Sequence, residues 1–138
     1  MNGDAGGRAL LSWYLDSSAI LKLIIDESES VAMRNIFDDR CLTSVISRIE
    51  VVRNIRRIDP LALTSAQNIL SRISMLPMND VVLRTAETIT ATASLKSLDC
   101  IHIASMITSA TPLLGIITYD KAMAANAEVL GIKVLSPK

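Results

Sequence analysis

Four acidic residues stand out in this chain because each lies beside a run of apolar residues. They are Asp16, Glu50, Asp99 and Asp120. A carboxylate next to buried hydrophobic sequence is costly unless it is paired, hydrogen-bonded or bound to a cation. If the fold gathers the four, a hard divalent metal ion is the simplest stabiliser, because such ions prefer carboxylate oxygen and water as ligands. An acidic metal site of this kind is typical of a metal-dependent nuclease.

Each acid also has an ordinary structural explanation. Asp16, Asp99 and Asp120 all precede sequence with helical character, and aspartate is a favourable N-cap residue that typically contributes about 1 kcal/mol. Glu50 can pair with Arg53 or Asn54 at helical spacing, which contributes roughly 0.2–0.5 kcal/mol. Composition alone leaves both interpretations open for every one of these residues.

The elements that must position the acids alternate between short apolar runs and longer amphipathic segments. This is the pattern of an α/β domain with a mainly parallel sheet. Strands are expected at residues 11–15, 41–43, 75–78, 114–118 and 132–135. Helices are expected at residues 17–25, 28–38, 44–58, 64–74, 79–93, 98–109 and 121–130. The strand at 75–78 contains Pro77 and is therefore expected near an edge of the sheet.

This map places the acids relative to the sheet. Asp16 and Asp120 directly follow strands, at the edge where open α/β sheets bind their ligands. Asp99 opens the helix at 98–109, and Glu50 lies about two turns into the helix that Ser44 caps. Further N-caps are expected at Ser28 and at Asn79 or Asp80, and Gly131 is expected to close the helix at 121–130.

Length and composition bound the remaining possibilities. The 138 residues fit one domain over 11–138, preceded by a polar, Gly-rich tail over 1–10. Hydrophobic residues make up 50% and the mean hydropathy is +0.39, yet no apolar run approaches the roughly 18 residues of a membrane helix. This excess of hydrophobic residues predicts a packed core and a partner-binding face, such as a homodimer interface. Cys41 and Cys100 show no metal-type spacing, which favours a reducing cytoplasm.

Basic and acidic residues are balanced, with 14 of each and a net charge of zero. Bulk charge therefore neither supports nor excludes a nucleic-acid partner, and any basic footprint must be local. The densest basic cluster, around Glu50, consists of Arg48, Arg53, Arg56 and Arg57. A solvated helix face explains this cluster equally well.

Several other classes of acidic or metal-binding site fit the sequence poorly. One histidine and two separated cysteines do not supply the nitrogen and sulfur ligands of a usual zinc site. A phosphatase of the Asp-x-Asp type requires an acid where Ser18 stands, and an adhesion module of the Asp-x-Ser-x-Ser type requires a serine where Ile20 stands. A receiver domain requires an adjacent acidic pair after its first strand, and Asp16 has no acidic neighbour.

The residues around the four acids resemble the motifs of PIN-domain ribonucleases, in particular the VapC toxins of bacterial toxin–antitoxin pairs. The segments are YLDSSAILKL at 14–23, TSVISRIEVVR at 43–53, SLDCIHIA at 97–104, and ITYDK at 117–121 followed by LGI at 130–132. They occur in the family's order, and the resemblance extends from about Trp13 to Ser136. Two departures, Lys96-Ser97 in place of a common arginine and Cys100 in place of a common alanine, bear on substrate preference rather than on the carboxylates.

The resemblance implies a PIN-like three-layer α/β/α domain and a metal-dependent endoribonuclease with Mg²⁺ as cofactor, for which Mn²⁺ substitutes. The implied catalytic residues are Asp16, Glu50, Asp99 and Asp120. Asp16 and Asp99 are the expected principal metal ligands, directly or through water, and the other two acids complete the pocket or help to hold a second ion.

Two further roles follow for neighbouring side chains. Ser18 and Thr118 are expected to orient the acids by hydrogen bonds. His102, three residues after Asp99, is expected to have a packing or hydrogen-bonding role rather than to act as a general base.

The resemblance also implies partners. The implied substrate is RNA, with Lys22, Arg53, Arg57, Lys96 and Lys121 as candidate phosphate contacts. A VapB-type antitoxin is expected to cover the acidic pocket and to dock on the helices over 17–38 and 44–58, and the family implies a homodimer. A catalytically silent PIN-like domain that only binds RNA or protein is the alternative that the sequence leaves open.

Overall fold

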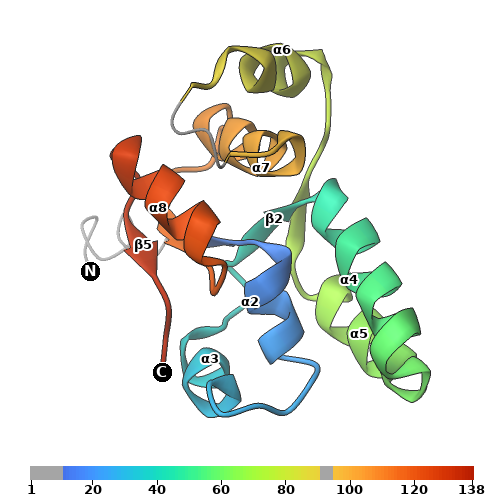
Figure 1. Cartoon of the computed structure of the whole chain (residues 1–138). Coiled ribbons are helices and arrows are strands. Elements are labelled where there is room, and N and C mark those ends of the chain that lie inside the picture. The colour runs from blue at the N-terminus through green and yellow to red at the C-terminus, as the bar shows by residue number, and fades with distance from the viewer. Residues whose placement is uncertain (1–10, 91–94) are drawn as a thin grey trace, which may run out of the picture.

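The centre of the protein is a five-stranded sheet in which the paired strands all run parallel. A computed structural model describes residues 11–90 and 95–138, and within these ranges the strand order is β3-β2-β1-β4-β5 (Figure 1). The strands are β1 (Ser12–Leu15), β2 (Leu42–Ser44), β3 (Ser74–Leu76), β4 (Leu113–Ile117) and β5 (Val134–Leu135). The expected parallel sheet is confirmed, and β3 lies at its edge, as Pro77 predicts.

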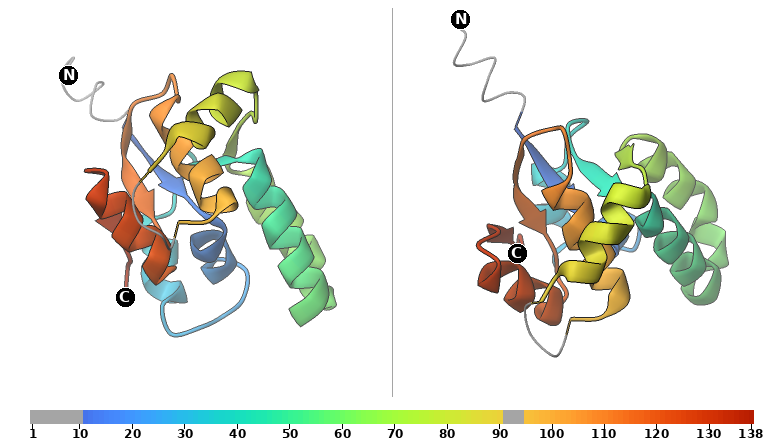
Figure 2. Two further views of the ribbon diagram at one scale, coloured as in Figure 1. Left: turned by 45° about the horizontal axis from the view of Figure 1, so that its top comes forward. Right: turned by 90° about the horizontal axis from the view of Figure 1, so that it is seen from above.

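Seven α-helices and one 3₁₀ helix occur in the described ranges. They are α2 (Ser17–Lys22), α3 (Ser30–Ile36), α4 (Val45–Ile58), η1 (Pro60–Ala62), α5 (Leu63–Ser71), α6 (Asp80–Thr88), α7 (Ser97–Ile107) and α8 (Lys121–Val129). Helices lie on both faces of the sheet, and α6 packs on the outside of α7 (Figure 2). None of the helices in the described part of the chain is long and apolar enough to cross a membrane.

The two central strands, β1 and β4, contribute side chains to two hydrophobic cores, one on each face of the sheet. Leu15 of β1 and Ile117 of β4 belong to the core covered by α2, α3, α4 and α5. Tyr14 and Ile116, one residue earlier in each strand, belong to the core beneath α7 and α8. Successive residues of a strand point to opposite faces, and all four side chains are fully buried. Two cores around one sheet give the three layers that the sequence predicts.

The strand order reverses between β1 and β4. The chain moves outward from β1 through β2 to β3, and then from β4 to β5 on the other side. In open parallel sheets, ligands bind beyond the carboxyl ends of the strands at such a switch point. Asp16 directly follows β1 and Thr118 directly follows β4, so both residues lie at this point.

Polar side chains fix the starts of four helices. The N-cap residues are Asp16 for α2, Ser44 for α4, Asn79 for α6 and Asp120 for α8, and each accepts a hydrogen bond from a backbone N–H in the first turn. Each such cap typically stabilises its helix by about 1 kcal/mol. Gly131 follows the end of α8 with φ of 77°, a left-handed conformation that favours glycine. These boundaries agree with the predicted ones.

The first two helices are shorter than predicted. α2 ends at Lys22, and α3 begins at Ser30 rather than after an N-cap at Ser28. The Ser30 hydroxyl accepts the Glu27 N–H at 2.9 Å and donates to the Ile25 carbonyl at 3.0 Å. This serine therefore closes a turn ahead of the helix, and the predicted cap at Ser28 is wrong.

Helix α6 also ends before its predicted last residue. A helix was expected over 79–93, but α6 ends at Thr88 because Ile89 adopts an extended backbone with φ of −71° and ψ of 121°. The predicted end at Ala93 and the predicted tail over 1–10 lie outside the described residues. The remaining elements agree with prediction to within a few residues, which is the usual uncertainty of a helix end.

Candidate active site

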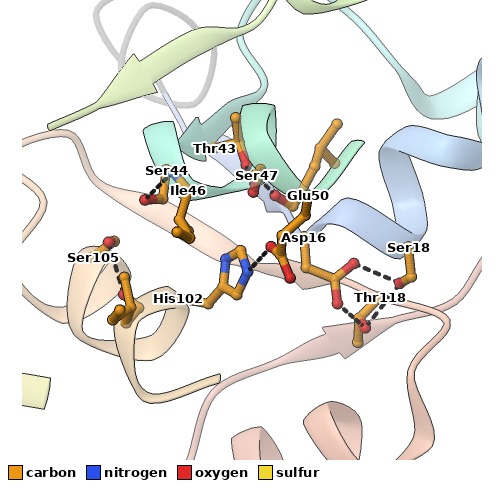
Figure 3. A network of polar contacts seen from close by, with 12 residues as sticks. Asp16, Ser18, Thr43, Ser44, Ile46, Ser47, Glu50, His102, Ser105 and Thr118 are labelled. Carbon is orange, nitrogen blue, oxygen red and sulfur yellow. Dashed lines mark hydrogen bonds and ion pairs between the residues drawn. The ribbon is translucent and has the colours of Figure 1, made fainter. Parts of the chain in front are cut away.

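Asp16 is the most buried of the four acids, with 3% of its surface exposed. Its Oδ1 accepts hydrogen bonds from the Ser18 hydroxyl at 2.6 Å and the Ala19 backbone N–H at 3.1 Å, and its Oδ2 accepts one from the Thr118 hydroxyl (Figure 3). Burial raises the pKa of the Asp16 carboxyl, and these three bonds oppose the rise. A carboxylate offers about four lone-pair sites, so Asp16 retains about one for a further ligand.

Hydrogen bonds of the Ser18 and Thr118 hydroxyls connect the carboxyl ends of β1 and β4. Besides their bonds to Asp16, Ser18 Oγ accepts the Tyr119 N–H at 2.8 Å and Thr118 Oγ1 accepts the Asp120 N–H at 3.1 Å. Both hydroxyls thus donate to Asp16, and each accepts a backbone N–H at or next to Asp120. The predicted orienting role of these two residues is confirmed.

Glu50 lies in the second turn of α4 and meets the histidine of α7. His102 Nε2 lies 2.8 Å from Glu50 Oε1, and the exposed fractions of the two side chains are 3% and 23% (Figure 3). The other ring nitrogen, Nδ1, lies 2.6 Å from the hydroxyl of Tyr14. The predicted hydrogen-bonding role of His102 is confirmed, and its partners are Glu50 and Tyr14 rather than Asp99.

Tyr14 has a polar role that the sequence pattern does not predict. Its ring belongs to the core of an apolar strand, where an aromatic residue is ordinarily a packing residue. The signal that was available is the hydroxyl itself, since a buried tyrosine oxygen usually finds a hydrogen-bond partner. Its partner, His102, stands 88 positions away in the chain, so spacing did not reveal it.

Asp99 lies in the first turn of α7, although not at the position expected. The helix begins at Ser97 with Lys96 as its N-cap residue, and Asp99 Oδ2 accepts the Lys96 N–H at 3.3 Å. The helix was predicted to begin at residue 98, so Asp99 is its third residue rather than its second, and its predicted place in the first turn is confirmed. Burial raises the pKa of the Asp99 carboxyl, and the negative charges of Asp120 and Glu50 raise it further.

Three of the four acids share one cavity at the carboxyl edge of the sheet. Its volume is about 460 Å³ and it is lined by Glu50, Lys96, Ser97, Leu98, Asp99, Asp120 and Ala122. Asp16 does not line this cavity. We call this space the acidic cavity.

A second cavity adjoins the first along α4. Its volume is about 710 Å³ and it is lined by Ile46, Ile49, Glu50, Arg53, Asn54, Arg56, Arg57 and Leu98. Glu50 and Leu98 line both cavities, so the two spaces meet at these residues. We call the second space the arginine groove. Of the predicted basic cluster, Arg48 lies elsewhere, beside Val52 and Gln67.

The five predicted phosphate contacts are not all gathered at the site. Lys96 lines the acidic cavity, and Arg53 and Arg57 line the arginine groove. Lys22 instead forms ion pairs with two glutamates at 3.1 and 2.9 Å. Lys121, the first residue of α8, lines neither space. Three of the five cations are therefore placed to meet a ligand that spans both cavities.

The donor chemistry of the site fits a hard divalent cation. Its acids offer carboxylate oxygen alone, which Mg²⁺ and Mn²⁺ prefer. Within the described ranges, no three His, Cys, Asp or Glu side chains stand close enough to form a ready-made ion cage. Mg²⁺ does not require one, because it usually keeps several of its waters and binds proteins through one or two carboxylates.

Comparison with known sequences connects this site to a family. Residues 13–129 match the sequence pattern of the PIN domain. Ribonuclease VapC35 of Mycobacterium tuberculosis is 35% identical over 130 residues, which cover 90% of this chain and 96% of that protein. Ribonuclease VapC47 of the same species is 31% identical over 131 residues with the same coverage. Ribonuclease VapC46 is 33% identical over 126 residues.

Solved structures share the fold. A toxin–antitoxin complex from Klebsiella pneumoniae contains a chain that matches with a TM-score of 0.71 at 15% identity, covering 91% of this chain and 98% of that one. A protein from Pyrobaculum aerophilum matches with a TM-score of 0.58 at 17% identity, over 85% of this chain and 80% of that one. At these identities the likeness concerns the fold alone, and it agrees with the three-layer arrangement described above.

Proposed function

The chain belongs to the PIN-domain family and to its VapC ribonucleases, and from this premise we propose that it is a metal-dependent endoribonuclease and the toxin of a toxin–antitoxin pair. The observation that carries the proposal is the acidic cavity, which Glu50, Asp99 and Asp120 line beside the buried Asp16 (Figure 3). The charges of Asp120 and Glu50 raise the pKa of the Asp99 carboxyl, so the ionised acids disfavour one another in the absence of a cation. A cation and a phosphodiester would use that arrangement.

The cofactor we infer is Mg²⁺, with Mn²⁺ as a substitute. Asp16 and Asp99 would be its principal ligands, and Glu50 and Asp120 would reach it directly or through water. About one lone-pair site remains on Asp16, and Asp99 is partly exposed, which is compatible with that division. When bound, such an ion stabilises negative charge on the phosphate and lowers the pKa of the attacking water.

The chain's own residues would supply orientation and proton transfer. Ser18 and Thr118 hold the Asp16 carboxylate in one rotamer through their hydrogen bonds. A carboxylate of the group would accept the proton of the attacking water. Arg53 and Arg57, in the arginine groove, would bind phosphates of the RNA backbone next to the cleaved bond.

An antitoxin of the VapB type is the partner we infer for the surface around α3 and α4. Val31, Ile49 and Ile58 are exposed apolar residues on these helices, with 60%, 53% and 56% of their surfaces accessible. Exposed apolar residues beside a charged pocket are a common feature of protein-binding sites. A segment with apolar side chains and a cationic residue would match both the surface and the acidic cavity.

We also infer a homodimer in a reducing cytoplasm. Exposed apolar residues on α6 and α7, such as Val81, Leu83 and Ile107, offer a second apolar surface away from the arginine groove. Cys41 and Cys100 are both free thiols, which agrees with a reducing compartment.

The experiment that tests the activity is cleavage of a labelled total-RNA pool by antitoxin-free protein, with Mg²⁺ or Mn²⁺ and with EDTA. The variants are Asp16→Ala and Asp99→Ala. Glu87→Gln, a charge removed from the exposed face of α6 and outside both cavities, is the matched control. We expect discrete products that require metal, persist in the control and disappear in both site variants.

The other outcomes are equally informative. Cleavage that survives Asp16→Ala or Asp99→Ala would place the activity elsewhere or in a contaminant. An absence of cleavage by folded, metal-binding protein would support the alternative, a catalytically silent domain that only binds RNA or protein.

A further inference from the structure

A line of buried hydrogen bonds leads from the start of α4 to the acidic cavity. The backbone N–H of Ser44 donates to the Tyr14 hydroxyl at 3.2 Å. The Tyr14 hydroxyl lies 2.6 Å from His102 Nδ1, and His102 Nε2 lies 2.8 Å from Glu50 Oε1. We call Tyr14 and His102, which join Ser44 to Glu50, the Tyr14–His102 bridge.

A neutral histidine completes the bridge in one arrangement of protons. The Ser44 N–H is only a donor, and a Glu50 carboxylate that carries no proton is only an acceptor. A neutral His102 that bonds to this carboxylate carries its proton on Nε2, which leaves Nδ1 as an acceptor. Tyr14 in turn donates its single proton to Nδ1 while its oxygen accepts from Ser44.

We propose that Tyr14 and His102 are positioning residues, which hold Oε1 of Glu50 through the Nε2–H tautomer so that Oε2 faces the acidic cavity. What Glu50 then does there rests on the proposed function, whereas the bridge itself is tested independently of it. Within the described residues, the Glu50 carboxylate makes no second hydrogen bond. Oε2 is thus the oxygen left for a cation or for water.

The bridge is suited to this role because both of its members are rigid. Tyr14 is fully buried and His102 is 2% exposed, and their rings meet edge to face, with centroids 5.8 Å apart and planes at 76°. Glu50, by contrast, has a flexible side chain that loses rotamer freedom when it is held. Partners behind a ligand commonly determine its orientation and affinity in this way.

One competing arrangement exists within the same cluster. Thr43 and Ser47 lie near the Tyr14 hydroxyl, although Thr43 Oγ1 is already 2.6 Å from both Ser47 Oγ and the Leu15 carbonyl. If Tyr14 donated to one of these hydroxyls, His102 would carry its proton on Nδ1. A neutral ring would then have no hydrogen on Nε2 to donate to Glu50, and only a ring protonated on both nitrogens would keep that bond. The arrangements therefore differ in which nitrogens of a single histidine carry a proton.

The tautomer can be measured directly because the chain contains one histidine. Nitrogen NMR of protein carrying isotope-labelled histidine, prepared without a histidine tag, reports His102 alone. We expect one protonated nitrogen, Nε2, and one unprotonated nitrogen, Nδ1, in the wild type. A ring protonated at Nδ1, alone or together with Nε2, would overturn the proposal without any variant or activity assay.

Two tyrosine variants test the positioning role. Tyr14→Phe keeps the ring but removes the donor to Nδ1. Tyr119→Phe is the matched control, because it also removes one hydrogen bond, of 2.6 Å to the Pro137 carbonyl, outside the bridge. We expect Tyr14→Phe to lose the single tautomer and to bind Mn²⁺, measured by electron paramagnetic resonance, about ten-fold more weakly. Tyr119→Phe should retain both properties.

A histidine pair covers the case in which Tyr14→Phe does not fold. His102→Gln retains an N–H donor that can reach Glu50, whereas His102→Leu does not. Mn²⁺ affinity should therefore be better preserved in His102→Gln than in His102→Leu. Equal affinities in this pair, or unchanged tautomer and affinity in Tyr14→Phe, would overturn the positioning role. A wild type with the expected tautomer and Mn²⁺ affinity but no RNA cleavage would count against the proposed function and not against the bridge.

Discussion

Asp16 and Thr118, which are 102 positions apart in the chain, are joined by a hydrogen bond where the two central strands end. The same threonine hydroxyl accepts the backbone N–H of Asp120 at 3.1 Å. One buried side chain thus connects two acids of the site that come from opposite sides of the switch point. The relationship makes the position of Asp16 depend on the pairing of β1 with β4 rather than on its own helix alone.

Removing this hydroxyl should affect both stability and activity. Thr118→Val keeps the shape of the side chain but leaves the Asp16 Oδ2 and the Asp120 N–H without this partner. A buried polar group left unpaired costs about 1–3 kcal/mol, so we expect urea denaturation to show a loss of about that size. Metal-dependent cleavage should fall by about ten-fold or more.

The control for Thr118→Val is Thr88→Val on α6. Thr88 Oγ1 also makes one hydrogen bond, to the Thr85 carbonyl at 2.8 Å, but in an exposed position. Its loss should change the free energy of unfolding by no more than about 0.5 kcal/mol. Equal effects of the two substitutions would show that the bond between Thr118 and Asp16 does not stabilise the site.

Gly115 permits the close approach of β5 to β4. A Cβ at this position would stand 2.2 Å from the Lys133 carbonyl oxygen, which accepts the Ile116 N–H at 2.9 Å. Gly115→Ala should push β5 away and lower the free energy of unfolding by about 3 kcal/mol. Gly131→Ala meets open space and suffers only from its φ of 77°, so its cost should be about 1 kcal/mol. Thermal denaturation that ranks Gly131→Ala as the more harmful change would contradict this packing.

Cys41 should be almost inert in the folded protein. Its exposed fraction is 1%, and burial raises the pKa of its thiol, which lowers the fraction of reactive thiolate. In a Cys100→Ala variant, alkylation of Cys41 should be at least about 100-fold slower than that of Cys100 in a Cys41→Ala variant. Urea should abolish the difference. Similar native-state rates of alkylation would show that the segment around Cys41 opens readily.

Local sequence predicted much of the fold because several boundaries depend on single residues. Ser44 places the start of α4, and Asp59-Pro60 places its end, since both act through neighbouring backbone groups. The predicted N-cap at Ser28 is wrong because a nearby serine, Ser30, forms hydrogen bonds to the preceding loop. Which serine bonds to the backbone there depends on the path of the loop, and the hydrophobic periodicity of the sequence does not predict that path.

The candidate site was predictable to a similar extent. The predicted strands place both Asp16 and Asp120 at the carboxyl edge of the sheet, where the Thr118 hydroxyl connects the two residues. The contact of His102 with Glu50 joins α7 to α4 across 52 positions, and its second contact joins it to Tyr14. These depend on how the helices pack over the sheet, which is set by long-range contacts.

Mn²⁺ should stabilise the protein through the acids of the site. An ion that binds only the folded state at 100 times its dissociation constant adds about 2.7 kcal/mol, so the melting temperature of the wild type should rise. Asp99→Asn should reduce that rise. The metal-free protein should also become slightly more stable. Burial and the negative charges of Asp120 and Glu50 disfavour the ionised Asp99 carboxylate, and asparagine removes its charge. Glu87→Gln, on the exposed face of α6, should behave like the wild type in both respects. An equal Mn²⁺ shift in Asp99→Asn and wild type, measured by thermal denaturation with EDTA as reference, would remove Asp99 from the ligand set.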